Sequence, residues 1–349
     1  MRALTVVPLQ PNTLALSNVE EPVARENQIL ARALALGVCG TDREIIAGHY
    51  GEAPEGADRL IIGHESLSEV VSAPAASDFA RGDLMVGIVR RPDPIPCANC
   101  AAGEWDMCRN GLYTEHGIKG AHGYAAERFA IDPGYAVKID QTLRDTGVLL
   151  EPASIVAKAW DHIERIATRA VWRPRTVLVT GAGPVGLLAA MVGVQRRLDV
   201  TIFDHNDEGI KPRLAEALGA RYHAGDISRL TLRPDIILEC TGAPSVIIAA
   251  LEITGPAGIV CLAGLSSGQH KVEIASDVLG RTMVLENDVV FGTVNANRRH
   301  YAMAADALAA ADQDWLRMMI TRRVPLSAWS DAFERRAGDV KTVIDFTLS

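Results

Sequence analysis

The fold of this chain is decided by the stretch Thr176-Val177-Leu178-Val179-Thr180-Gly181-Ala182-Gly183-Pro184-Val185-Gly186. Its near-continuous apolar start is typical of a strand buried on both faces of a parallel sheet. The pattern G-x-G-x-x-G follows, and we expect a helix over residues 185–196. In this pattern the glycines allow a tight turn, close approach of a pyrophosphate and close packing of helix on strand. The stretch therefore predicts a dinucleotide site at the start of a doubly wound α/β domain.

The residues that follow extend the same pattern. We expect strands at 200–203, 236–238 and 258–262 and a helix at 211–219, so residues 156–294 form a domain with a parallel sheet covered by helices. Asp204 closes the second strand, 21 residues after Gly183, where an acid that binds the cofactor ribose is expected. A carboxylate there favours NAD over NADP, and the next residues, His205 and Asn206, include no arginine for a 2′-phosphate. The alternative is an ordinary glycine-rich turn with a solvated aspartate.

Composition restricts the class of protein. The 349 residues are 48% apolar and 22% charged, with a net charge of −8, so we expect a two-domain globular protein that does not bind nucleic acid. The apolar runs are shorter than the ~18 residues that span a bilayer, and the first residues lack the order of a secretory signal. These features predict a cytoplasmic protein that does not enter a membrane. Of six cysteines, three lie between 97 and 108, which in such a chain favours metal over disulfide.

The rest of the chain predicts a second, mostly β domain. Short strands are expected at 29–36, 67–71 and 84–89, followed by a helix from about Pro152 to Thr168. After about Asn295 a helix and a final strand at 342–346 remain, which is too little for a third domain. We therefore assign residues 1–155 and 295–349 to one domain.

This first domain carries the residue types of a zinc site. Catalytic zinc takes three protein ligands from Cys, His and Asp or Glu and leaves a position open. Cys39 and His64, with one or both of Glu65 and Glu151, meet that need. Each residue alone is more often structural, but their joint occurrence beside a dinucleotide fold favours a catalytic metal.

At this point the sequence resembles the zinc-dependent medium-chain dehydrogenases, and among them the glucose (aldose 1-) dehydrogenase branch. The resemblance rests on residues 37–45, 60–65, 89–92, 106–108, 116–118, 151–152, 292–295 and 341–342. It implies a GroES-like, mostly β catalytic domain joined to a Rossmann nucleotide-binding domain. It also implies a homodimer or homotetramer.

The resemblance further implies roles for individual residues. Cys39, His64, Glu65 and Glu151 are expected to bind the catalytic zinc. Thr41 is expected to pass on the substrate's proton, and Glu115 to accept from sugar hydroxyls. His49 is either part of the proton relay or an exposed loop histidine. The expected substrate contacts are Thr41, Glu65, Glu115 and Glu151, and the expected cofactor contacts are Gly181, Gly183, Pro184, Val185, Gly186, Asp204, His205, Thr241, Leu265 and Asn295.

Two departures from the branch affect these expectations. Many relatives hold a structural zinc on C-x2-C-x2-C-x7-C, whereas here Cys97, Cys100 and Cys108 match the last three positions and Pro94 occupies the first. A structural zinc therefore needs another ligand, such as Asp93, and the alternative is a loop with three free thiols. Members of the branch commonly have Asn-Arg-Arg or Gly-Arg-Arg after the second strand and accept NADP, whereas this chain has Asp-His-Asn.

These features predict a zinc enzyme that transfers hydride from C1 of an aldose such as glucose to NAD, giving the lactone. A polyol or secondary-alcohol dehydrogenase on the same scaffold is the first alternative. A non-catalytic NAD-binding sensor is the second, and it requires the metal residues to have no function.

Overall fold

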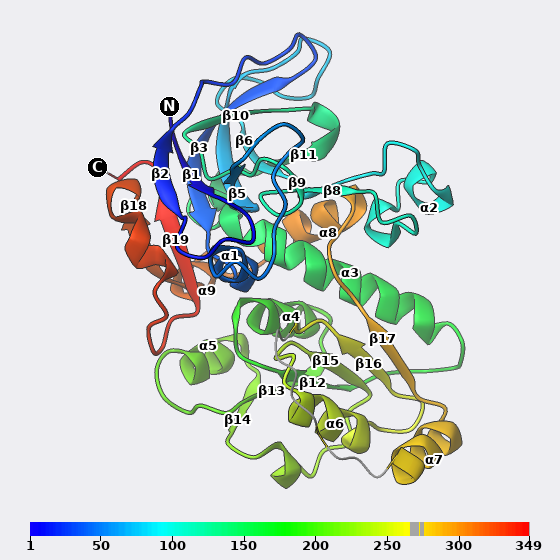
Figure 1. Ribbon diagram of the computed structural model, residues 1–349. Helices are drawn as coiled ribbons and strands as arrows, with labels where there is room; N and C mark the ends of the chain where they lie inside the picture. Colours follow the sequence, from blue (N-terminus) through cyan, green and yellow to red (C-terminus); the bar gives the residue numbers. More distant parts are fainter. Residues whose placement is uncertain (266–271, 273–275, 349) are drawn as a thin grey trace. The chain divides into compact units, whose positions relative to one another are not determined.

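The computed structural model describes residues 1–265, 272 and 276–348. The chain divides into two compact units (Figure 1). The first unit comprises Met1–Ser154 and Asn295–Ser349, and the second comprises Ile155–Val294. The first unit contains three sheets and the second unit one among the described residues.

The second unit contains the parallel sheet that the sequence predicts. Its strand order is β14-β13-β12-β15-β16-β17 among the described residues, and these neighbouring strands pair in parallel. The strands are β12 (Thr176–Thr180), β13 (Asp199–Asp204), β14 (Arg221–Ala224), β15 (Ile236–Glu239), β16 (Ile259–Leu262) and β17 (Val289–Gly292). The central strands are buried because their Val, Ile and Leu side chains meet covering elements on both faces.

The helices of this unit cover its sheet. They are α4 (Pro184–Gln195), α5 (Lys211–Leu218), α6 (Pro244–Ile253) and α7 (Ser276–Glu286), and the unit also contains α3 (Leu150–Ala167) from Ile155 onward. Figure 1 shows α4 beside α5 and α6 beside α7, on opposite sides of the sheet. The strand order changes direction at β12, which is the point where doubly wound sheets bind ligands at the carboxyl ends of their strands.

The first unit is mostly antiparallel β-structure. Its largest sheet has the order β11-β6-β5-β3-β19-β18, with β10 also paired to β3. The strands of this sheet are β3 (Ile29–Gly37), β5 (Glu65–Ser72), β6 (Leu84–Gly87), β10 (Arg128–Ile131), β11 (Ala136–Ile139), β18 (Ile320–Pro325) and β19 (Lys341–Asp345). Val343 of β19 pairs with Gly37 of β3, so the end of the chain completes the sheet that its beginning starts.

Two smaller sheets and several short helices complete this unit. One small sheet joins β1 (Arg2–Val6), β2 (Ala15–Asn18) and β4 (Leu60–Ile61), and the other joins β7 (Arg90–Arg91), β8 (Thr114–His116) and β9 (Gly120–Ala121). The helices are α1 (Gly40–Ile46), α2 (Ala98–Ala101), α8 (Arg298–Ala309), α9 (Gln313–Met319) and the start of α3 (Leu150–Ala167), with a 3-10 turn η1 at Trp105–Met107. Within the described ranges, we find no helix with the length and apolar character needed to cross a bilayer.

Candidate active site

Three of the four predicted catalytic ligands meet in the first unit. The Cys39 sulfur, a His64 ring nitrogen and a Glu65 carboxylate oxygen all lie within 4.8 Å of one another. Cys39 precedes α1, and Glu65 begins β5 directly after His64. His64 and Glu65 are almost fully buried, at 4% and 1% exposure. One thiol, one imidazole and one carboxylate form a donor set that suits zinc with an open position.

Asp42 orients two members of this group. Its Oδ2 accepts from the Cys39 backbone N–H at 2.8 Å, and its Oδ1 lies 3.3 Å from His64 Nδ1. A carboxylate at one ring nitrogen fixes the tautomer and turns the other nitrogen toward a metal. Burial acts to lower the pKa of His64, but Asp42 and the Cys39 sulfur outweigh it and raise this pKa well above its usual value. The thiol, imidazole and carboxylate, with Asp42 beside His64 Nδ1, nevertheless form a donor set that fits a zinc ion, which binds histidine in its neutral form.

A buried ion pair holds Glu65 from its other side. The Lys341 ammonium contacts Glu65 Oε2, and both side chains are 2% exposed. Lys341 also donates to the Val38 carbonyl at 3.3 Å. Gly37 leaves room for the pair, since a β-carbon there would lie 2.0 Å from Glu65 Oε2. Burial acts to lower the pKa of Lys341, and Glu65 reverses this and raises it.

Glu151, the fourth predicted ligand, lies outside the group of three. It is buried in the first turn of α3. Burial raises its pKa to about 7; His64 opposes this rise, whereas Glu65 adds to it. The carboxyl group is thus within electrostatic reach of two of the ligands, but the structure does not bring it to their sulfur, nitrogen and oxygen atoms.

The two residues proposed for the proton relay differ in position. Thr41 Oγ1 lies 4.0 Å from the Cys39 sulfur, so its hydroxyl borders the ligand group. His49 lies at the surface with a 67% exposed side chain, and its Nδ1 is 3.0 Å from Glu44 Oε2. For His49 the structure matches the exposed-loop alternative.

Glu115, the predicted sugar contact, lies in β8 opposite Arg90 of β7. Its Oε1 accepts from Arg90 and from the Asn295 side-chain amide, at 2.9 and 2.6 Å. Asn295 was predicted as a cofactor contact, and here its side chain binds Glu115 in the first unit. All three side chains are buried.

The glycine-rich turn of the second unit has the form that a dinucleotide requires. Gly181 has a φ of +90° and follows β12, and Gly183 is the N-cap of α4 with Pro184 at its first position. Val185 and Gly186 lie in the first turn of the helix. A β-carbon at Gly186 would lie 1.8 Å from the Gly181 carbonyl oxygen, so only glycine allows this contact between helix and turn.

The predicted ribose acid lies against this turn. Asp204 Oδ2 accepts from the Ala182 N–H at 2.8 Å and from Lys211 Nζ at 3.0 Å. His205 is exposed, and its Nδ1 lies 3.1 Å from Asp204 Oδ1. Burial acts to raise the pKa of Asp204, but the Ala182 N–H and Lys211 outweigh it and lower this pKa. The carboxylate is therefore ionised and held at the carboxyl end of β13.

The two other predicted cofactor contacts of this unit follow neighbouring strands. Thr241 lies after β15, where its N–H donates to the buried Glu239 at 2.7 Å. Leu265 lies after β16 and is 82% exposed. The Leu265 backbone passes so close to Gly242 that a β-carbon there would lie 2.6 Å away. Both residues therefore occupy the edge of the sheet where β12 and β13 end.

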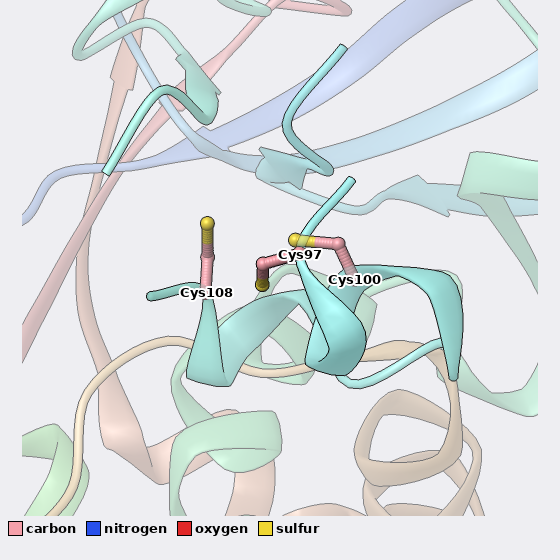
Figure 2. A group of neighbouring side chains, drawn as sticks. All are labelled: Cys97, Cys100 and Cys108. Atoms are coloured by element: carbon pink, nitrogen blue, oxygen red, sulfur yellow. The ribbon is translucent and has the colours of Figure 1, made fainter. Parts of the chain in front are cut away.

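The three clustered cysteines also meet. Their sulfur atoms lie within 4.8 Å of one another, and Figure 2 shows the side chains gathered around α2 and the end of η1. Hydrogen bonds from the Arg109 and Cys100 N–H groups lower the pKa of Cys97 to about 6, whereas burial raises that of Cys100 to about 11. We call these residues, Cys97, Cys100 and Cys108, the thiol cluster.

Asp93 borders the thiol cluster without joining its ligand atoms. Its backbone N–H donates to the Cys100 sulfur, and its Oδ1 accepts from the Ile95 N–H at 2.8 Å. Asp93 is only 2% exposed, and its Oδ2 has no hydrogen-bond partner among the residues that the structure describes. Three thiols fit zinc incompletely, and the carboxylate oxygen without a partner belongs to the residue whose backbone N–H binds the Cys100 sulfur.

Comparison with known proteins assigns the family. Residues 144–346 match the family model described as glucose dehydrogenase C-terminus, and residues 25–141 match the alcohol dehydrogenase GroES-like domain. The chain belongs to the glucose dehydrogenase family. This membership confirms the GroES-like and Rossmann architecture and the zinc-dependent medium-chain dehydrogenase resemblance.

Individual members of the glucose dehydrogenase family match the whole chain. Glucose 1-dehydrogenase of Thermoproteus tenax is 41% identical over 350 residues, and that of Methanocella arvoryzae is 39% identical over 356 residues, each covering 99% of both chains. The solved structure of Haloferax mediterranei glucose dehydrogenase in complex with NADP, Zn and gluconolactone is 31% identical. It has a TM-score of 0.91 and covers 100% of both chains.

Sequence reasoning assigned no role to Asp42, Lys341 or Arg90, although all three lie in motifs that carried the resemblance. Asp42 had a detectable signal, because an acid three residues after an N-cap reaches back to that residue's N–H. Lys341 is a charged residue at the start of an otherwise apolar final strand. No signal in the sequence pairs Arg90 with Glu115.

Proposed function

We propose that this protein oxidises C1 of an aldose such as glucose to the lactone, with a catalytic zinc and a nicotinamide cofactor. The observation that carries the proposal is the convergence of Cys39, His64 and Glu65, oriented by Asp42, in a chain whose full-length relatives are named glucose 1-dehydrogenases. The two compact units are proposed to act as the catalytic domain (1–155 and 295–349) and the nucleotide-binding domain (156–294).

The chain's own residues have separate tasks in this reaction. Cys39 and His64 hold the metal, with Glu65 and Glu151 as carboxylates that bind it or exchange at it. Zinc supplies a positive charge that lowers the pKa of a bound hydroxyl, and the nicotinamide supplies the hydride acceptor. Lys341 offsets the charge of Glu65, which otherwise would be buried without a partner.

Thr41 and Glu115 are proposed to handle the sugar. The Thr41 hydroxyl borders the Cys39 sulfur, where it can accept the proton from the substrate hydroxyl and donate its own onward. Glu115 accepts hydrogen bonds from sugar hydroxyls. His49 shares the relay only if its surface loop moves toward the ligand group.

We infer that NAD is preferred over NADP. Support comes from Asp204, which is ionised and lies beside the glycine-rich turn, where it repels a 2′-phosphate. Lys211 offsets part of that charge. Dissociation constants for NADH and NADPH, measured by fluorescence titration, test the inference. Equal or tighter NADPH binding would contradict it.

We further propose that the thiol cluster holds a second, structural zinc, with Asp93 as the fourth ligand. The support is the proximity of the three sulfurs, the hydrogen bond from the Asp93 backbone to the Cys100 sulfur, and the lack of a described partner for Asp93 Oδ2. Homodimers or homotetramers are proposed from the family resemblance, and β17 forms an edge of its sheet among the described strands.

A substrate panel combined with metal analysis tests the proposed reaction. Purified protein is assayed with aldoses, sorbitol, xylitol and simple alcohols, with NAD and NADP in parallel. Aldoses are expected to give the highest kcat/KM. A preference for polyols would favour the alternative, a polyol dehydrogenase on the same scaffold. Cys39→Ser is expected to lose turnover and one zinc while NADH still binds. Cys261→Ala is the matched control, because Cys261 is a buried cysteine of β16 in the second unit.

A further inference from the structure

The Glu115 carboxylate is held entirely through one of its two oxygens. Oε1 accepts from Arg90 Nε at 3.1 Å, from Arg90 Nη2 at 2.9 Å and from Asn295 Nδ2 at 2.6 Å. Oε2 receives no hydrogen bond from the described residues of the chain. Because carboxylate oxygens are strong acceptors, this oxygen is left to accept from a ligand.

Arg90 is itself fixed on three sides. Its Nη1 donates to the Asp106 carbonyl at 3.1 Å, and its guanidinium carbon lies 3.7 Å from the centre of the Tyr113 ring. Arg90 and Glu115 also face each other across the β7–β8 pair. A planar guanidinium with five fixed donors can hold a carboxylate in one orientation, whereas a lysine ammonium cannot.

The position of this pair is unusual for a salt bridge that serves stability alone. Arg90 and Glu115 have side chains only 6% and 7% exposed, and buried ion pairs contribute little net stability because both charges lose their water. The neighbouring Arg91 shows the contrast. It lies on the same two-residue strand, but it donates to the Ile88 carbonyl and stacks on Tyr135.

We propose that Arg90 is a positioning residue for sugar recognition. It binds Oε1, so that Oε2 is presented as a single directed acceptor for one hydroxyl of the sugar. This inference rests on the proposed aldose oxidation. It goes further by assigning discrimination between sugars, through the presence and direction of one hydroxyl, to a residue that does not touch the substrate.

Steady-state kinetics of Arg90→Lys test the proposal. The variant keeps the positive charge but loses the two-pronged contact and the stacking on Tyr113. We expect KM for glucose to rise about tenfold, the usual scale for a hydrogen bond to a charged group, with kcat changing less than about threefold. Arg91→Lys, the matched control, is expected to leave both constants within about twofold of the wild type.

Deoxyglucoses provide the readout that a purely structural role would not change. For the deoxy sugar that lacks the hydroxyl bound by Glu115, wild type and Arg90→Lys are expected to have the same KM. The other deoxy sugars should retain the tenfold difference. An equal rise of KM for every sugar, or a fall of kcat alone, would overturn the positioning role while leaving aldose oxidation intact.

A second variant covers the case in which Arg90→Lys does not fold. Tyr113→Leu removes the ring under the guanidinium but leaves the ion pair, and it should raise KM by a few-fold with the same dependence on the deoxy sugar. If it changes all sugars equally, the proposal fails. If the wild-type enzyme oxidises no aldose, both the proposed function and this inference fail, and the wild-type assay alone identifies that outcome.

Discussion

The glycine-rich turn allows stability and cofactor binding to be separated by two substitutions three residues apart. In Gly186→Ala the added methyl lies 1.8 Å from the Gly181 carbonyl oxygen and 3.0 Å from its carbon. The start of α4 must then move by roughly 1 Å, because nonbonded carbon and oxygen atoms do not approach so closely. Overpacking of this kind costs about 2 kcal/mol, and it lowers the melting temperature of a unit of this size by roughly 5–8 °C.

Gly183→Ala is the matched substitution with the opposite effect. A β-carbon there meets nothing within 4 Å, and the residue has a φ of −82°, which alanine adopts readily. Stability is expected to change by less than about 1 kcal/mol, since the weaker N-cap and the stiffer unfolded chain oppose each other. NADH affinity should fall more than tenfold, because the methyl takes the space of the pyrophosphate.

Two measurements on each variant check this reasoning. Circular dichroism gives the melting temperature of the metal-loaded protein without nucleotide, and fluorescence titration gives the NADH dissociation constant. A Gly186→Ala protein that melts within 1 °C of the wild type would refute the packing argument. A Gly183→Ala protein that binds NADH normally would refute the placement of the pyrophosphate at this turn.

Further substitutions test the metal sites and the response to acid. Asp42→Asn should weaken zinc binding about 10- to 100-fold in competition with a chelator, because His64 loses the carboxylate that orients its ring. Pro94→Cys supplies the missing thiol of the cluster and should slow release of the second zinc to a chelator; unchanged release would count against a metal there. Burial, with nearby Arg91, lowers the pKa of His116 to about 3, so the unfolded chain gains a proton below pH ~6.5 and stability falls with acid. Between pH 7.5 and 5, the His116→Phe variant should lose about 1 kcal/mol less stability than the wild type, because it keeps the stacked ring but cannot take up a proton. An equal loss of stability in both proteins, measured by urea unfolding at the two pH values, would contradict this.

Several elements of the second unit could be predicted because local signals decide them, whereas β14, α6, α7 and β17 were not predicted. The apolar run of β12 and the glycines after it specify strand, turn and helix within a few residues. Helix α3 shows the limit of such signals. We expected it to start at Pro152, and it starts at Leu150. Proline is tolerated there because the first four N–H groups of a helix have no partner within it.

The end of the chain was harder to predict. We expected one helix and one strand after Asn295, whereas α9 and β18 are also present. Strand β18 carries Arg322 and Arg323, and it is a strand because β19 pairs with it rather than because of its own pattern. Tertiary pairing therefore decides this element.

The candidate site could also be predicted only in part from the sequence. Residue type and motif brought together Cys39, His64 and Glu65, which the structure finds within 4.8 Å of one another. They could not distinguish these from Glu151 and Asp93, which lie beside ligand groups without joining them. Such distinctions depend on side-chain direction, which long-range packing determines.

The ion pair between Glu65 and Lys341 sets an order of events during synthesis. Glu65 is translated long before Lys341 and the strand β19 that carries it. At usual elongation rates the interval is on the order of tens of seconds. During it Glu65 lacks its counter-charge and β3 lacks the neighbour that β19 provides. All of the second unit is translated within that interval, so it can finish folding first. The buried ion pair that holds Glu65 is therefore complete only after Lys341 has been made, and a nascent chain that stalls before this residue lacks it.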